Sequence, residues 1–183
     1  MSIKTRVFLS LLMGGLFVLS SSPGLAKNDM HIKMTFEVED GQLQLKKDRS
    51  DTTKSNCKKD DHPGCYDIET EHVGKFELIL DKGDSECGSA DAWKFEAVVL
   101  GGEGRVDEPQ PKPGTWGNIS SEAAQDFNAD TMTGVVNIIP GDKKRVHFED
   151  QNDHELSIWY KVSVRNCGSG QILEYDPRVD NRG

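Results

Sequence analysis

The sequence predicts an all-β fold, an antiparallel β-sandwich that is Ig-like in style and has about eight strands. Apolar and polar residues alternate with a period of two in several segments, as expected of strands with one buried face. Turn-forming residues separate these segments, and no stretch shows the pattern of a long amphipathic helix. A closed β-barrel with the same strand pattern is the alternative.

The first half of the chain contains four of these segments. Residues 32–39 alternate strictly and are followed by Asp40-Gly41 and a second alternating run at 42–45. Asp-Gly between two such runs predicts a hairpin, because both central residues of its turn need a positive φ. Two further strands are expected at residues 75–80 and 93–100.

The second half repeats the pattern. Residues 135–139 form a β-branched run that ends at Pro140-Gly141, and residues 145–149 alternate again. The longest alternation covers residues 156–164, and a glycine-rich turn then precedes a last strand at 172–175.

Two long polar segments do not fit the strand pattern. Residues 46–70 are highly charged, and residues 101–130 combine prolines and glycines with a helix-capable stretch at 120–127. Long loops in small domains are often functional, so these loops are the first place to look for a binding site.

The N-terminus resembles a secretory signal peptide. Lys4 and Arg6 precede an apolar run at 7–19, and the small residues Gly24 and Ala26 fit a signal peptidase. The apolar run is shorter than the roughly 20 residues that span a bilayer. We therefore expect cleavage of residues 1–26, no membrane insertion afterwards, and one domain at 27–183 in the periplasm or outside a bacterial cell.

The expected mature chain is strongly acidic. Loss of Lys4 and Arg6 changes the formal charge from −9 to −11. Such a chain repels nucleic acid and anionic membrane surfaces, so neither is an expected partner.

All four cysteines follow the signal peptide, and an even number in an exported chain predicts disulfides. Among three possible pairings we favour Cys57–Cys65, within one polar loop, and Cys87–Cys167, between distant segments. Chain entropy gives the first about 2.6 kcal/mol and the second about 4.5 kcal/mol of stabilisation. Zinc–thiolate ligation is disfavoured, because paired zinc ligands normally stand two to four residues apart.

No catalytic or cofactor motif is apparent. His154-Glu155 begins a zinc-protease motif, but Ile158 stands where its second histidine belongs. Cys87-Gly88-Ser89 resembles the start of a cysteine-protease motif that the next residues do not continue. Two acidic runs, at 81–91 and 149–155, offer oxygen ligands for calcium without the spacing of a calcium loop, and charged hairpin tips are the alternative.

Two tryptophans are candidates for a partner surface. Trp159 lies out of step with the inward-facing set of its strand, so either a loop or helix covers it or it marks a contact surface. Trp116 lies in the Pro/Gly-rich loop, where an aromatic ring either stacks on a sugar or anchors a protein partner, or packs onto the sandwich.

The C-terminal residues resemble the DP-EP family of small bacterial β proteins. The strand at 160–164, a glycine-rich turn and the stretch from Ile172 through Asp176-Pro177-Arg178 to Asn181 are similar to that family's closing Asp-Pro-x-Ile-x-Asn pattern. The resemblance implies a β-sandwich and no activity. Pro177 lacks an N–H donor, which suits an edge position where the last strand leaves its sheet.

Together these features predict an exported, non-catalytic binding module for a protein or glycan, without a cofactor. Two alternatives remain open. One is a metal-dependent protein that holds calcium in its acidic loops, with His147 or His154 as a further ligand. The other is a hydrolase whose residues converge only in three dimensions.

Overall fold

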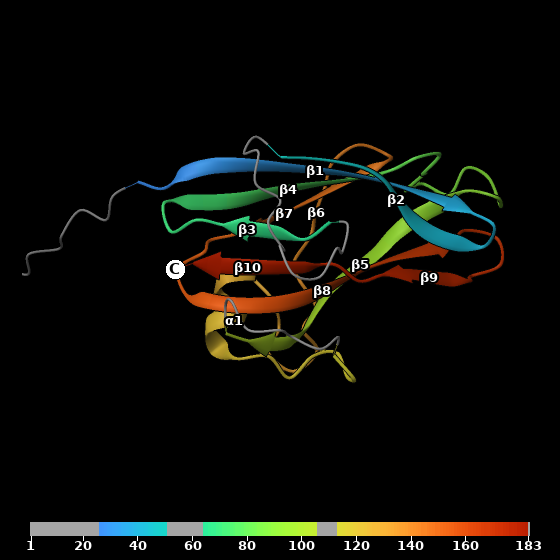
Figure 1. The fold of residues 1–183 in the computed structure, drawn as a ribbon. Coiled ribbons are helices and arrows are strands. Elements are labelled where there is room, and N and C mark those ends of the chain that lie inside the picture. Colours follow the sequence, from blue (N-terminus) through green and yellow to red (C-terminus); the bar gives the residue numbers. More distant parts are fainter. Residues whose placement is uncertain (1–25, 51–63, 106–112, 183) are drawn as a thin grey trace, which may run out of the picture.

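The computed structural model describes residues 26–50, 64–105 and 113–182 and places them in two packed sheets (Figure 1). One sheet has the strand order β2-β1-β4-β7-β6, and the other has the order β3-β10-β8-β5 with β9 also paired to β8. The elements are β1 (Asn28–Glu39), β2 (Gln42–Ser50), β3 (Tyr66–Ile68), β4 (His72–Leu80), β5 (Trp93–Gly104), α1 (Ser121–Phe127), β6 (Ile139–Pro140), β7 (Arg145–Asp150), β8 (Glu155–Asn166), β9 (Ile172–Tyr175) and β10 (Arg178–Arg182).

The predicted sandwich is confirmed, and the sheets do not close into a barrel. Both sheets are mixed, however, because β1 pairs with β4 and β3 pairs with β10 in parallel. Hairpin signals relate only strands that follow each other, whereas parallel partners need a crossover connection. The predicted hairpin is present between β1 and β2, and its turn residues Asp40 and Gly41 have φ values of 50° and 73°.

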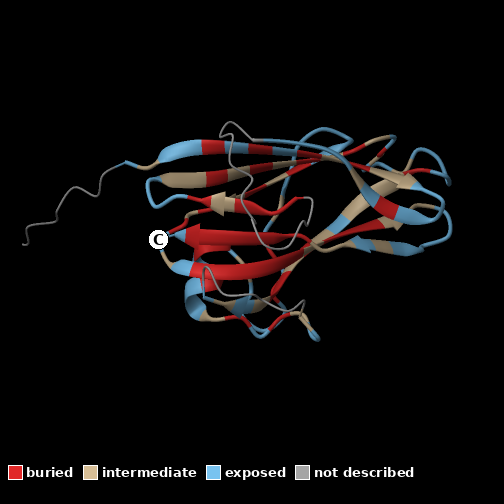
Figure 2. Cartoon of the chain, in the orientation of Figure 1, coloured by how far each residue is buried: buried red, intermediate tan, exposed pale blue. Residues whose placement is uncertain are grey.

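The core lies between the sheets and is filled by the inward-facing residues of each strand. Phe76 of β4 stacks on Phe148 of β7 with 4.4 Å between ring centroids, and Tyr160 of β8 meets both rings edge-on. The Tyr160 hydroxyl donates a hydrogen bond of 3.0 Å to the carbonyl of Gly64, which satisfies the only polar atom of this side chain. The central strand β8 is buried on both faces, as Figure 2 shows by its almost continuous red colour.

Three strand predictions need correction. β3 and β10 were not predicted, and residues 135–139 form mainly isolated bridges, with only Ile139 and Pro140 in a regular strand. Pro177 does not stand where the chain leaves a sheet. It separates β9 from β10, and β10 then lies between β3 and β8 in the interior of the sheet. Pro177 has no N–H to donate, but its carbonyl accepts a hydrogen bond from the Tyr160 N–H, so the step from β9 to β10 stays attached to β8.

The helix-capable stretch is confirmed as α1. The side chain of Ser120 caps its N-terminus by accepting a hydrogen bond from the Ala123 N–H, and Asn128 ends it in a left-handed conformation. α1 lies at the end of the sandwich where β8 begins and β10 finishes (Figure 1). Within the described ranges, no helix has the length and hydropathy of a membrane span.

Candidate functional site

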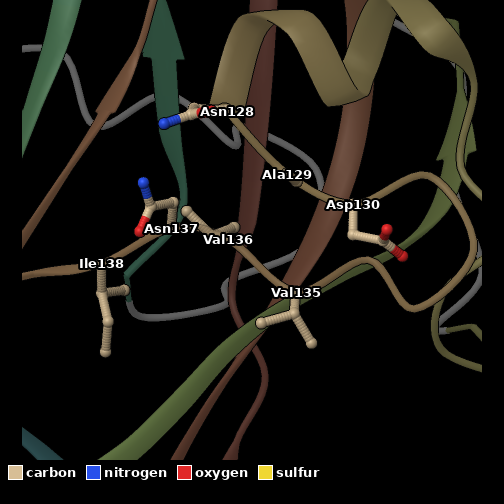
Figure 3. A pocket seen from close by; sticks show the side chains of 7 residues that line it. All are labelled: Asn128, Ala129, Asp130, Val135, Val136, Asn137 and Ile138. Carbon is tan, nitrogen blue, oxygen red and sulfur yellow. The ribbon is translucent and has the colours of Figure 1, made fainter.

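The strongest candidate site is an open pocket on the segment that follows α1. The pocket has a volume of about 500 Å³ and lies on the segment that connects α1 to β6 (Figure 3). Its lining consists of Asn128, Ala129, Asp130, Val135, Val136, Asn137 and Ile138. We call this pocket, together with the neighbouring exposed Met132 and Ile139, the docking surface.

A tight turn shapes one side of the docking surface. The Asp130 carboxylate accepts hydrogen bonds from the N–H groups of Met132 and Thr133 and from the Thr133 hydroxyl. These bonds hold the pKa of Asp130 below its usual value, so the carboxylate is charged at neutral pH. Gly134 closes the turn with a φ of 69°, and a Cβ at this position would lie 2.5 Å from the Leu100 carbonyl oxygen. The turn thus requires glycine and seats the pocket firmly on β5.

The other side of the docking surface is the extended segment between the turn at Gly134 and β6. The Val136 N–H donates to the Val98 carbonyl, and the Asn137 N–H donates to the Asn128 carbonyl. Val136 therefore points into the core, whereas Val135 points outward. Figure 3 shows the Asn128 and Asn137 amide groups turned toward the same side of the pocket. Neither amide hydrogen-bonds to another side chain or backbone group in the described part of the chain, which leaves both able to bind a ligand.

Exposed apolar side chains concentrate around the pocket. Met132 is 75% exposed, Val135 42% and Ile139 56%, and the described chain has only one other exposed large hydrophobic residue, Ile172 on β9. Three of these four side chains thus lie within eight residues of one another. Exposed apolar side chains that gather beside a pocket with polar groups are typical of a binding site.

The adjacent sheet edge does not favour strand addition by a partner. β6 has two residues, and one of them, Pro140, has no N–H to offer. Recognition at the docking surface would therefore depend on side chains and on the two amides.

The two predicted partner-surface tryptophans do not lie on this surface. Trp159 is 3% exposed, so the covered alternative applies and the contact-surface prediction is wrong for it. The loop that contains Pro113 and Trp116 packs over Gly101 and Gly102 of β5, and a Cβ at Gly102 would lie 3.0 Å from Trp159 Cδ1. Trp116 is half-buried beneath the Lys161 ammonium, which lies 5.0 Å from its ring centroid.

The predicted long-range disulfide is present. Cys87 and Cys167 are bonded and have a Cα–Cα distance of 5.4 Å. Cys65 is also disulfide-bonded, and its predicted partner Cys57 lies outside the described residues.

The acidic runs do not converge into a calcium site among the residues described. Lys46 binds Asp81, Lys143 binds Glu86, and Lys75 binds Glu149, so lysines neutralise much of both runs. The described group with metal-compatible spacing is instead Glu69, Glu71 and His72 in the turn before β4. Its glutamates are exposed, and no buried, unpartnered group is directed toward them, so we assign no ion to it.

A buried polar cluster is centred on Asp126, near the C-terminal end of α1. Asp126 of α1 accepts hydrogen bonds from the backbone N–H groups of Asp153 and His154, and Nδ1 of His154 lies 2.8 Å from its Oδ1. This hydrogen bond raises the pKa of His154. The pair provides the oriented histidine that a hydrolase needs. In the chain as described, no hydroxyl or thiol hydrogen-bonds to His154.

Sequence reasoning missed the docking surface, although it predicted α1 and noted residues 135–139. The β-branched run at 135–139 predicts a strand, and only the position of the neighbouring strands shows that Val135 and Ile139 are exposed.

No protein-family model and no curated protein matches the chain. The DP-EP resemblance remains a prediction.

Proposed function

We propose that the protein is an exported, non-catalytic binding module that takes a segment of a partner protein at its docking surface. The observation that carries the proposal is the concentration of exposed aliphatic side chains around a pocket with two free amides. The Cys87–Cys167 disulfide supports a location outside the reducing cytoplasm.

The chemistry of the lining favours a protein segment over a glycan. No aromatic residue lines the pocket, whereas sugars are commonly held by stacking on aromatic rings. The side chains of Val135 and Ile138 suit aliphatic anchors. An amide that offers one donor face and one acceptor face, as Asn128 and Asn137 do, matches the N–H and C=O of an extended peptide.

Selection of a displayed random decapeptide library on the purified protein tests this function. We expect selected peptides with paired aliphatic residues, and Val135→Asp or Ile139→Asp should weaken their binding about 10- to 100-fold, because each removes the burial of one aliphatic side chain. Ile172→Asp is the matched control, since it replaces an equally apolar, exposed residue on the distant β9. Equal effects of all three substitutions, or peptides that bind regardless of them, would contradict the proposed surface.

Export is tested separately by mass spectrometry of the protein recovered from the exported fraction. The expected mass begins at Lys27 and is lower by about four hydrogens, as two disulfides require. A mass that includes residues 1–26, or one with free thiols, would contradict the export part of the proposal.

A further inference from the structure

Three polar side chains from different elements meet in the interior beside α1. The Asn181 amide of β10 donates to Asp150 Oδ1 of β7 at 2.9 Å and to Asp126 Oδ2 of α1 at 3.3 Å. All three side chains are buried. One amide group thus joins the helix to both sheets of the sandwich.

The hydrogen bonds of this cluster leave two buried oxygen atoms without a donor in the described part of the chain. Asp150 Oδ1 accepts from the Asn152 N–H and from Asn181, but among the described residues no donor reaches Asp150 Oδ2. The Asn181 carbonyl oxygen also lacks a donor, although it is buried. A proton on Asp150 Oδ2 would supply the missing donor, because a carboxylic acid and a primary amide form two complementary hydrogen bonds.

Burial opposes the ionisation of Asp150, and the charges around it act in both directions. Asp126 faces it from α1, and Gly74, opposite it on β4, offers no side chain. On β10, Arg178 is paired with Asp180 at 2.8 Å. Lys27 lowers the pKa of Asp150, but its ammonium binds the backbone carbonyls of Gln151 and Asn152 and the Asp153 carboxylate. Burial raises the pKa of Asp150 to about 8, although the hydrogen bonds from Asn181 and the Asn152 N–H lower it, and the Asp126 charge is a smaller contribution that raises it.

The cluster is coupled to the docking surface through the end of α1. Asp126 stands two residues before Asn128, which lines the pocket and whose carbonyl accepts the Asn137 N–H. Movement of the end of α1 would therefore displace Asn128 and break its bond to Asn137, and the two sides of the pocket would separate.

We propose that Asp150 is protonated in the folded protein and that its pair with Asn181 is a pH-sensitive latch, which holds α1 and the pocket wall in place and releases them as the pH rises. Ionised Asp150 and Asp126 would face each other across a single amide in a buried site. Loss of the proton from His154, which contacts Asp126, acts in the same direction. The latch stands on this geometry alone, and only its consequence for partner binding rests on the proposed function.

The test is amide hydrogen exchange of the ligand-free mature chain, expressed as protection factors between pH 6 and pH 9. We expect protection in α1 and at Asn137 to fall at least tenfold over this range. Asp150→Asn should hold the decrease below twofold, because the new amide supplies the donor that protonated Asp150 would. Asp29→Asn, which removes an exposed carboxylate, should behave like the wild type.

Constant protection in the wild type, or an equal decrease in Asp150→Asn, would overturn the latch. The carboxyl ¹³C shift of Asp150 in the wild type gives a second measurement that needs no variant. A titration above neutral pH that accompanies the loss of protection supports the latch, and one below pH 5 overturns it. The exchange experiment uses no ligand, so its outcome is independent of the peptide selection. A negative exchange result would overturn the latch and not the docking surface, and a negative selection would overturn the docking surface and not the latch.

Discussion

Removal of the Cys87–Cys167 disulfide by Cys87→Ala/Cys167→Ala should destabilise the fold substantially. The bond joins the loop before β5 to the turn after β8, and its cysteines are 80 residues apart in sequence. Trp93 and Asn166 already pair at this end of β5 and β8, so the folded ends stay together without the bond. The disulfide therefore acts mainly on the unfolded chain, which it prevents from expanding.

The chain-entropy relation gives a loss of about 4.5 kcal/mol for a loop of this length. With a urea m-value of about 2 kcal/mol per molar, the unfolding midpoint should decrease by about 2 M. Alanine is the appropriate replacement, because Cys87 has a φ of 53° and alanine keeps the same Cβ without adding strain. Urea unfolding followed by tryptophan fluorescence measures the change.

Cys57→Ala/Cys65→Ala is the matched comparison, since it removes the other predicted bond from a short loop. Its expected loss is about 2.6 kcal/mol, so the two double variants should differ by about 2 kcal/mol. An equal or larger loss from the short-loop variant would refute the argument from loop length. The m-value should also rise when the long-range bond is removed, because the unfolded chain then exposes more surface.

Three further predictions concern the interior. Stability should decrease from pH 5 to pH 8, because the pKa of Asp150 is raised to about 8 in the folded protein and folding takes up a proton in this range. Asp150 contributes at most about 1.4 kcal/mol per pH unit, and the raised pKa of His154 adds to the decrease above about 6.5. Asp150→Asn should flatten this slope in urea titrations at several pH values, and an unchanged slope would contradict the assignment. Gly74→Ala should cost about 1 to 3 kcal/mol by calorimetry, because its Cβ would lie 2.6 Å from Ile68 Cδ1, and a neutral effect would show that this contact relaxes freely. Tyr160→Phe should cost about 1 kcal/mol or more in urea unfolding, because the buried Gly64 carbonyl loses its donor, whereas a stabilised variant would contradict that bond.

The strands that the sequence predicts well share one property. β1, β4 and β7 each bury one face and expose the other, so their burial alternates as their residues do. β10 lacks that signal, because Arg178, Val179, Asp180 and Asn181 are all buried. Its polar residues find partners that leave no periodic pattern in the sequence. Arg178 pairs with Asp180 in the same strand, and the Asn181 amide donates to Asp150 of β7.

Burial on both faces also explains the error at Trp159. The alternation of residues 156–164 correctly placed Ile158 and Tyr160 in the core and Trp159 on the opposite face. Whether that face meets solvent depends on the loop around Pro113, which lies more than forty residues away in sequence. Period-two patterns assign residues to a face, but only tertiary packing decides what covers that face.

The acidic run at 149–155 shows how the same pattern could have indicated the latch. The inward positions of β7 are Val146 and Phe148, and the next position in that series is Asp150. A carboxylate at an inward position at the end of a strand must either reach water or find buried partners, and here Asn152 and Asn181 provide them. Glu149, one position earlier, points outward and binds Lys75. The density of charge alone suggests a single exposed hairpin tip. The alternation along β7 instead places Glu149 on the solvated face and Asp150 on the buried face, and Asp150 is the group whose proton the fold requires.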